Sequence, residues 1–153
     1  MRPTPPVWRS ILYVPGNVPK FIDRAHERGA DCVLVDLEDS VQPAQKPEAR
    51  AMLPETMKKV ARGGADVAVR INRPMRLAVQ DIEAAVRPGL SALFITKTES
   101  VQHLKLLRRQ LIDQKAHSGD VATRPIEAGD QPELHRVGTG REDNGNRADV
   151  EAA

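Results

Sequence analysis

The chain has 153 residues, enough for one modest domain, and 40% of them are hydrophobic but only 3% aromatic, which predicts an aliphatic core. A formal net charge of +2, with both signs mixed along the chain, predicts no binding to nucleic acid or to a membrane surface. No apolar stretch suits a membrane span or a signal peptide, and a lone cysteine, Cys32, excludes an internal disulfide, so we expect a soluble, cytoplasmic protein.

Four short apolar runs predict β-strands, and the amphipathic stretches between them predict helices. In chain order we expect a strand at 11–14, a helix at 19–28, a strand at 32–37, a helix at 47–62, a strand at 67–71, a helix at 77–86, a strand at 92–95 and a helix at 101–112. The apolar runs are continuous, which is typical of parallel strands covered on both faces. Cys32 is expected in the core, Pro54 predicts a kink or a late start of its helix, and His26 is expected on an exposed helix face.

Strand alternating with helix predicts an α/β fold with a parallel sheet. Four such units in about 110 residues match the repeat of a β/α (TIM-type) barrel, which takes about 250 residues in full. Residues 1–112 are therefore expected to form the N-terminal half of a barrel domain, and residues 113–153, which lack apolar periodicity, a degenerate or disordered tail. Half a barrel exposes a strand edge and an apolar face, which predicts a homo-oligomer or a partner subunit.

Polar residues follow each predicted strand, where barrel enzymes place their chemistry. They are Gly16 after the first strand, Asp36, Glu38 and Asp39 after the second, Arg70 and Asn72 at the third, and Lys97 and Glu99 after the fourth. Arg70 interrupts an apolar strand, so it is expected either to bind a carboxylate or 2-oxo acid or to form a structural ion pair with Asp36 or Glu38. The acidic residues could orient Mg²⁺-bound water or neutralise Arg70. Schiff-base chemistry at Lys97 is not expected, because Glu99 would favour the charged ammonium.

Five blocks of this sequence resemble the citrate lyase beta-subunit family. They are residues 9–16 (RSxLxVPG), residues 29–41 (GADxxxxDLEDxV), Lys46 with Ala49 and Arg50 (KxxAR), residues 69–72 (VRxN) and residues 97–100 (KxES), in the family's order and spacing. The resemblance covers about residues 9–112 and extends to malyl-CoA lyases and metal-dependent 2-keto acid aldolases.

The resemblance implies a β/α barrel and Mg²⁺-dependent cleavage of a 3-hydroxyacyl-CoA, such as citryl-CoA or malyl-CoA, to acetyl-CoA and a 2-oxo acid such as oxaloacetate. It implies a catalytic set of Arg70, Asp36 and Glu38, and a substrate-binding set of Arg70, Asn72, Arg9 and Gly16. The two metal carboxylates would be Glu127 and Asp143.

The sequence departs from the family pattern at Thr96, where the family has Pro, and more seriously downstream. Glu127 and Asp143 lie closer together than a strand–helix–strand unit allows, and the last two strands are missing. The tail is therefore interpreted as a truncated, deleted or frame-shifted remnant. Three functions stay open: an active lyase, a catalytically inactive half-barrel or regulatory and interaction subunit of the same family, and a generic α/β ligand-binding domain.

Overall fold

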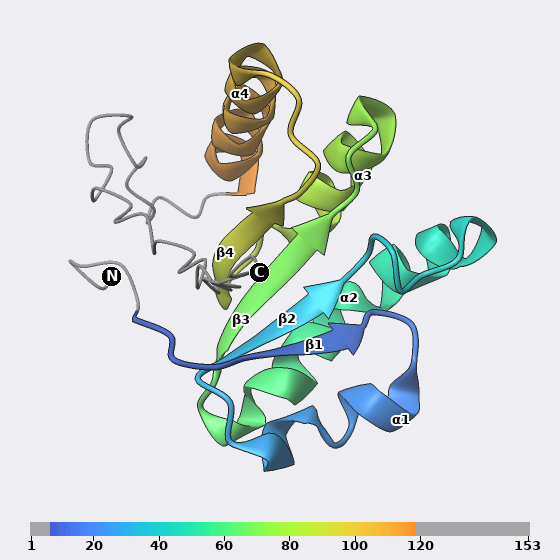
Figure 1. Cartoon of the computed structure of the whole chain (residues 1–153), viewed down its shortest axis with the longest axis vertical. Coiled ribbons are helices and arrows are strands. Elements are labelled where there is room, and N and C mark those ends of the chain that lie inside the picture. Colours follow the sequence, from blue (N-terminus) through green and yellow to red (C-terminus); the bar gives the residue numbers. More distant parts are fainter. Residues whose placement is uncertain (1–6, 119–153) are drawn as a thin grey trace, which may run out of the picture. The chain divides into compact units, whose positions relative to one another are not determined.

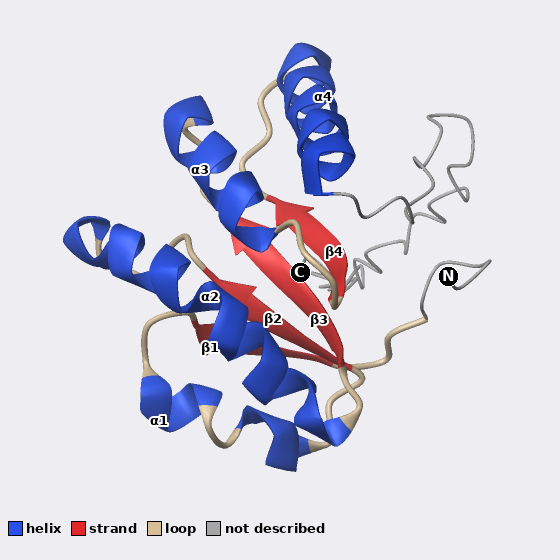
Figure 2. Cartoon of the chain, turned by 180° about the vertical axis from the view of Figure 1, so that it is seen from behind, coloured by secondary structure: helices blue, strands red, loops and turns tan. Residues whose placement is uncertain are grey.

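The computed structural model describes residues 7–118, which form a parallel four-stranded sheet with helices along one face (Figures 1 and 2). The elements are β1 (Ile11–Pro15), α1 (Pro19–Ile22), β2 (Cys32–Asp36), α2 (Lys46–Val60), β3 (Asp66–Ile71), α3 (Met75–Ala85), β4 (Leu90–Ile95) and α4 (Val101–Ser118), with short 3₁₀ turns at Ala25–Arg28, Pro43–Gln45 and Ala61–Gly63. The chain divides into two units at Ala122 and Thr123, and all described residues belong to the first.

The strand order is sequential, β1-β2-β3-β4, and every neighbouring pair is parallel. Figure 2 shows the helices on the same face of the sheet. A doubly wound sheet would reverse its strand order and carry helices on both faces. Sequential order with helices on one face is instead the arrangement of a β/α barrel, so the predicted fold class is confirmed as four consecutive units of a partial barrel.

The main core lies between the sheet and the helices. Side chains of β2 and β3 that point toward the helices, such as Val35 and Val69, pack with Leu53 of α2, Ile82 of α3 and Leu107 of α4. A smaller cluster of Cys32, Leu34 and Ala68 lies on the opposite face of the sheet, with Trp8, Ala92 and Phe94 against it. The expectation that Cys32 is a core residue is confirmed, and its burial raises the pKa of the thiol to about 11.

Among the four strands that residues 7–118 form, the inner strand β2 is the one in which every residue is buried. The prediction of covered strands is wrong for β1, where Ile11 is 38% exposed and Tyr13 is 54% exposed, and for β4, where Ile95 is 36% exposed. Both are edge strands among the residues that the structure describes. Continuous apolar sequence therefore marks strands that need cover on both faces, and β1 and β4 do not receive it from residues 7–118.

Several element boundaries differ from the sequence-based expectations. The predicted helix 19–28 is two pieces, α1 and a 3₁₀ turn, because Arg24 leaves helical backbone geometry between them. Helix α2 starts at Lys46 and runs through Pro54, so a late start was wrong. Helix α4 continues to Ser118, which places the expected boundary at residue 112 inside a helix.

One expected burial pattern was also wrong. His26 is not on an exposed face: it is half-buried, and its Nδ1 atom has no hydrogen-bond partner among the described residues. On α4, Leu107 is buried and Leu111 partly buried, but Leu104 and Ile112 are exposed. None of the helices within residues 7–118 is long and apolar enough to cross a membrane.

The core predicts a clear contrast between two leucine substitutions. Leu53 is fully buried beneath the sheet, so Leu53→Ala removes packing that α2 needs and is expected to lower the free energy of unfolding by about 2–5 kcal/mol. Leu106 is 58% exposed, so Leu106→Ala is the matched control and should change it by less than about 0.5 kcal/mol. Urea unfolding followed by circular dichroism measures both, and equal losses would contradict this core.

Candidate functional site

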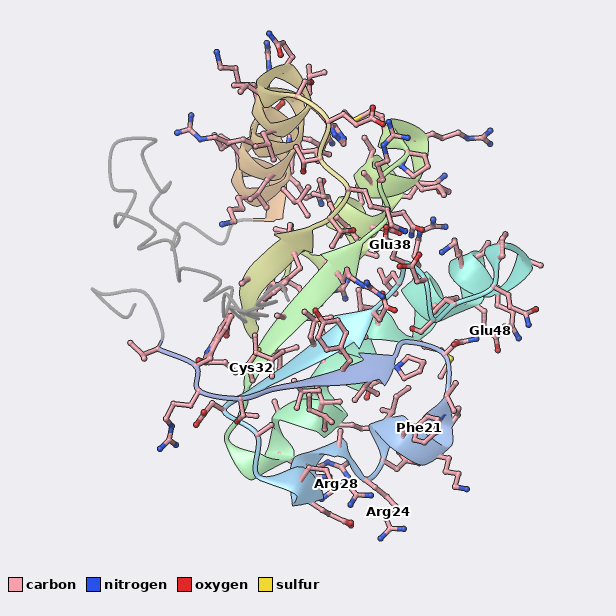
Figure 3. All side chains as sticks on the ribbon, viewed as in Figure 1. Phe21, Arg24, Arg28, Cys32, Glu38 and Glu48 are labelled. Atoms are coloured by element: carbon pink, nitrogen blue, oxygen red, sulfur yellow. The ribbon has the colours of Figure 1, made fainter. Side chains whose placement is uncertain are left out.

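The carboxyl ends of β2, β3 and β4 bring an ionic cluster together at one edge of the sheet. We call it the strand-end cluster: Asp36, Glu38, Asp39, Arg70, Thr96 and Lys97. These residues come from three separate segments of the chain and contact one another directly. Figure 3 shows Glu38 beyond the carboxyl ends of the strands and Cys32 toward their other end.

The centre of the cluster is the pair of Asp36 and Arg70. The two residues are register partners at the ends of β2 and β3, so the sheet itself sets them side by side. Arg70 donates from Nε to Asp36 Oδ1 at 2.8 Å and from Nη2 to Oδ2 at 2.6 Å, a two-point contact in which the planar guanidinium faces the carboxylate. The sequence left open whether Arg70 forms a structural ion pair or binds substrate, and in this structure the ion pair is present.

Asp36 is 1% exposed and is held by more than Arg70. The backbone N–H of Glu38 donates to Oδ1 at 2.7 Å, and the backbone N–H and hydroxyl of Ser40 both donate to Oδ2. Burial by itself raises the pKa of Asp36, but the hydrogen bonds from Arg70, Ser40 and Glu38 outweigh burial and lower that pKa to about 2. Asp36 is therefore an anion at neutral pH and a poor proton donor or acceptor.

Glu38 is the second buried carboxylate, at 6% exposure. Its Oε2 accepts from the Thr96 hydroxyl at 2.7 Å and lies 3.4 Å from Arg70 Nη1, and its Oε1 lies 3.1 Å from Lys97 Nζ. This one carboxylate thus contacts Arg70 of β3 and both residues that directly follow β4. The departure from the family pattern at Thr96 places a hydroxyl donor on this carboxylate.

Lys97 lies over the acidic residues in a left-handed backbone conformation, with φ of 54°. Hydrogen bonds to Asp39 and then to Glu38 raise the pKa of its ammonium, and Lys97 in turn lowers the pKa of Asp39. The expected partner, Glu99, was wrong, because Glu99 pairs with Arg73 instead. The electrostatic effect that disfavours a Schiff base is present, but other carboxylates produce it.

One edge of the Arg70 guanidinium is more weakly occupied than the others. Nη1 lies 3.4 Å from Glu38 and 3.5 Å from Asp39, longer than an ordinary hydrogen bond, whereas Nε and Nη2 are held closely by Asp36. The Arg70 side chain is 16% exposed, and the Tyr13 ring lies 5.4 Å from its guanidinium carbon. Arg70 is therefore pre-oriented by Asp36 and keeps donor capacity at Nη1 for an anion.

Gly16 and Asn72, both predicted to bind substrate, lie beside the cluster but are occupied by protein contacts. The Gly16 N–H donates to the Asp36 carbonyl at 2.9 Å, and a Cβ atom there would come within 3.0 Å of that oxygen, which explains a glycine at this close approach. Asn72 is 3% exposed, and its Nδ2 donates to Leu37 O and to Asp81 Oδ2. Their substrate-binding role stays a prediction.

The structure does not bring Arg9 to the cluster. Arg9 precedes β1 and pairs with Asp31, which precedes β2, so both lie at the amino ends of the strands. This exposed pair lowers the pKa of Asp31 to about 2, chiefly through the side-chain hydrogen bond. Arg9 is therefore not among the residues that surround Arg70, and its predicted part in substrate binding stays a prediction.

The predicted metal ligands, Glu127 and Asp143, lie outside the described residues. Within residues 7–118, no group of three or more histidine, cysteine, aspartate or glutamate side chains is arranged to hold a metal ion. Asp36 and Glu38 are instead engaged by Arg70, Lys97 and hydroxyl or amide donors. The described part of the chain therefore does not supply a magnesium site by itself.

Sequence reasoning gave no role to Lys46, although the KxxAR block contains it. Its Nζ donates to the carbonyl oxygens of Leu37 and Glu38, directly behind the strand-end cluster. The sequence offers one signal for this role: Lys46 stands at the start of an amphipathic helix, eight residues after Glu38. The structure shows that the lysine is buried there.

Comparison with known proteins covers the part of the chain that forms the barrel units and the strand-end cluster. The family described as HpcH/HpaI aldolase/citrate lyase matches residues 9–127. The chain belongs to this family. It is 32% identical over 112 residues to citrate lyase subunit beta of Leuconostoc mesenteroides subsp. cremoris, covering 72% of this chain and 37% of that protein. It is 33% identical over 100 residues to mitochondrial citramalyl-CoA lyase of Homo sapiens, covering 63% and 29%.

The chain is also 32% identical over 99 residues to the (3S)-malyl-CoA thioesterase of Cereibacter sphaeroides, covering 64% of this chain and 35% of that protein. The matched segment thus spans little more than a third of the length of these three relatives at most. The family resemblance seen in the sequence is confirmed, and the shared region includes the strand-end cluster.

The depressed pKa of Asp36 predicts a specific acid response. Because the pKa of Asp36 in the folded state, about 2, lies below the ordinary aspartate value of 3.8, the ionised carboxylate stabilises the fold by about 2 kcal/mol above pH 4, and this stabilisation is lost as the pH falls toward 2. Asp36→Asn leaves Arg70 without its counter-ion and should lower the free energy of unfolding by about 3 kcal/mol at pH 7. The difference between wild type and variant should shrink as the pH falls from 5 to 2.

Urea unfolding at a series of pH values measures this difference. Asp39→Asn is the control, because Asp39 is 56% exposed and makes its contacts in solvent. A difference between wild type and Asp36→Asn that stays constant from pH 5 to pH 2 would contradict the assignment.

Proposed function

We propose that this chain carries the substrate-carboxylate site of a carbon–carbon lyase that cleaves a 3-hydroxyacyl-CoA, such as citryl-CoA or malyl-CoA, to acetyl-CoA and a 2-oxo acid. The observation that supports it most is the Arg70 guanidinium: Asp36 holds two of its donors closely, whereas Nη1 makes only longer contacts, with Glu38 and Asp39, that an incoming carboxylate would displace. A carboxylate next to the reacting carbonyl is common to the 2-oxo acids that such a reaction releases. Family membership supports the same reaction class.

In this proposal each cluster residue has a separate task. Arg70 binds and orients the substrate carboxylate. Asp36 keeps the guanidinium plane fixed, so that little side-chain entropy is lost when the substrate binds. Glu38 and Lys97 border the approach to Nη1 and set its charge. Asp36 does not transfer protons, because its pKa of about 2 keeps it ionised. Glu38 makes the shorter of the two contacts with Arg70 Nη1, at 3.4 Å against 3.5 Å for Asp39.

The charge of the cluster supports the proposal that a divalent cation, Mg²⁺, completes the site. Three carboxylates, Asp36, Glu38 and Asp39, face two cations, Arg70 and Lys97, so the cluster carries a net charge of −1 before any substrate arrives. A 2-oxo acid adds further negative charge. The described residues do not fit a magnesium site, so we assign its carboxylates to Glu127 and Asp143 as a proposal and derive no step through the metal.

A second function, an inactive half-barrel or interaction subunit, is favoured by a different observation. Ile11 and Tyr13 of the edge strand β1 leave apolar surface exposed on the helix-free side of the sheet. Exposed apolar surface beside an unpaired strand edge favours association with another copy or a partner subunit. A cytoplasmic setting, where the buried Cys32 thiol would stay reduced, is part of either proposal.

If Arg70 binds the substrate carboxylate, the affinity for oxaloacetate should depend on the planar shape of its guanidinium group and not only on its charge. Arg70→Lys keeps one positive charge but loses the planar fork, so we expect oxaloacetate to bind at least tenfold more weakly, about 1.4 kcal/mol. Arg9→Lys makes the same exchange at the other end of the sheet and should leave binding unchanged. Titration calorimetry with oxaloacetate and Mg²⁺ measures both, and equal effects of the two variants would contradict the site.

Turnover and assembly separate the two functions. Mg²⁺-dependent release of acetyl-CoA from citryl-CoA or malyl-CoA by the full chain, abolished by Arg70→Ala, is the result expected of a lyase. A stable oligomer in sedimentation experiments, with no turnover of either thioester, would overturn the lyase proposal in favour of an interaction subunit. Oxaloacetate binding that does not depend on Mg²⁺ and is accompanied by no turnover would point to a generic ligand-binding domain.

A further inference from the structure

A layer of buried polar side chains lies directly behind the strand-end cluster, between the strand ends and helices α2 and α3. It consists of Lys46 and Arg50 of α2, Asn72 after β3 and Asp81 of α3. Lys46 is 8% exposed, Asn72 3% and Asp81 0%. Buried charges are costly, and apolar side chains would hold a helix against a sheet without that cost. Packing alone therefore does not explain why these four side chains are polar.

The contacts of Lys46 indicate that task. Its Nζ donates to Leu37 O at 2.8 Å and to Glu38 O at 2.6 Å, so one ammonium binds two consecutive carbonyls. These carbonyls belong to the two planar peptide groups on either side of the Glu38 Cα atom. Because peptide groups are planar, fixing both of them fixes the backbone dihedrals of Glu38 and the direction in which its side chain leaves the backbone.

The rest of the layer supports the first of these peptide groups, the one between Leu37 and Glu38. Asn72 Nδ2 donates to Leu37 O at 2.9 Å, and Asp81 accepts from both the backbone and the side chain of Asn72. Arg50 Nε in turn donates to Asp81 at 2.6 Å. The Leu37 N–H also donates to the Arg70 carbonyl. The segment that carries Glu38 is therefore held by β3 through Arg70 and by α2 through Lys46.

We propose that Lys46 is a positioning residue, a buried ammonium that fixes the Leu37–Glu38 backbone and thereby aims the Glu38 carboxylate at Arg70, Thr96 and Lys97. Its significance for catalysis rests on the function proposed above. Burial lowers the pKa of Lys46, while the nearby carboxylates of Asp81, Asp36 and Glu38 act in the opposite direction and favour the charged ammonium. Those carboxylates face it from the strand ends and from α3, and Arg50 is the cation nearby on its own helix.

The alternative is that Lys46 only holds α2 against the sheet. The two explanations differ in where a substitution of Lys46 would raise amide exchange: in the segment after β2 alone, or across the whole fold. If Lys46 positions the loop, Lys46→Met should let the segment after β2 open by itself. The backbone N–H groups of Glu38 and Ser40, which donate to Asp36, would then exchange with solvent at least tenfold faster relative to the N–H groups of the β2–β3 ladder.

The experiment is amide hydrogen exchange followed by NMR on the full chain. Lys59→Met is the matched control, because Lys59 lies on the same helix and its Nζ pairs with Asp23 at 2.6 Å, away from the strand ends. We expect no selective change in the control. Acceleration of Glu38 and Ser40 by the same factor as the ladder, or no acceleration at all, would overturn the proposal.

A wild-type measurement covers the case in which Lys46→Met does not fold. A buried ammonium bound to two carbonyls should give a slowly exchanging Nζ resonance, with couplings across the hydrogen bonds to the carbonyl carbons of Leu37 and Glu38. A rapidly exchanging, solvated ammonium at Lys46 would overturn the inference.

Oxaloacetate, used as the probe with Mg²⁺, separates this inference from the proposed function. If the wild type binds it, Lys46→Met should weaken binding at least fivefold and Lys59→Met should not. Failure of the wild type to bind oxaloacetate would count against the proposed function, whereas the exchange rates of Glu38 and Ser40 would still decide whether Lys46 positions the loop.

Discussion

The ion pair between Asp36 and Arg70 is the contact on which the carboxyl edge of the sheet depends. Parallel pairing sets the two residues side by side at the ends of β2 and β3, and the pair then fixes the guanidinium plane. Asp36 also accepts from Glu38 and Ser40, so the loop after β2 is folded around the same carboxylate. A single buried anion thus organises a strand end, a loop and the only arginine of β3.

The buried charged side chains gather at the carboxyl ends of the strands, where the proposed substrate site lies. Compared with apolar side chains of similar size in the same place, a buried pair of this kind contributes little net stability, because the desolvation of both ions offsets much of their attraction. Removing one partner, however, leaves the other charge buried and uncompensated. The strand-end cluster and the polar layer behind it together place several charged side chains in a region that apolar residues could fill. Their joint geometry holds one donor edge of Arg70 toward an approaching anion.

The sequence was sufficient for the strands, the parallel α/β class and the ionic character of the strand ends, because apolar runs and chain order determine them. It could not choose a role for Arg70, since ion pairing with Asp36 depends on register between strands 34 residues apart. It placed Lys97 against Glu99, two residues away, whereas the real partners come from the loop after β2. It grouped Arg9 with the site, although Arg9 precedes its strand and so lies at the other end of the sheet. At Lys97 the sequence neighbour Glu99 was taken in place of Glu38 and Asp39, which come close only in the fold.

The helix-free face of the sheet links the two functions that the structure supports. Tyr13 is 54% exposed on β1, and its ring stacks over Arg70, so the apolar surface that favours association adjoins the group that would bind substrate. In a closed β/α barrel this face is the packed interior. Whatever covers it excludes water from Arg70 and Glu38, and ionic contacts strengthen as the local dielectric constant falls. In the lyase proposed above, covering this face and binding a substrate carboxylate at Arg70 would therefore reinforce each other.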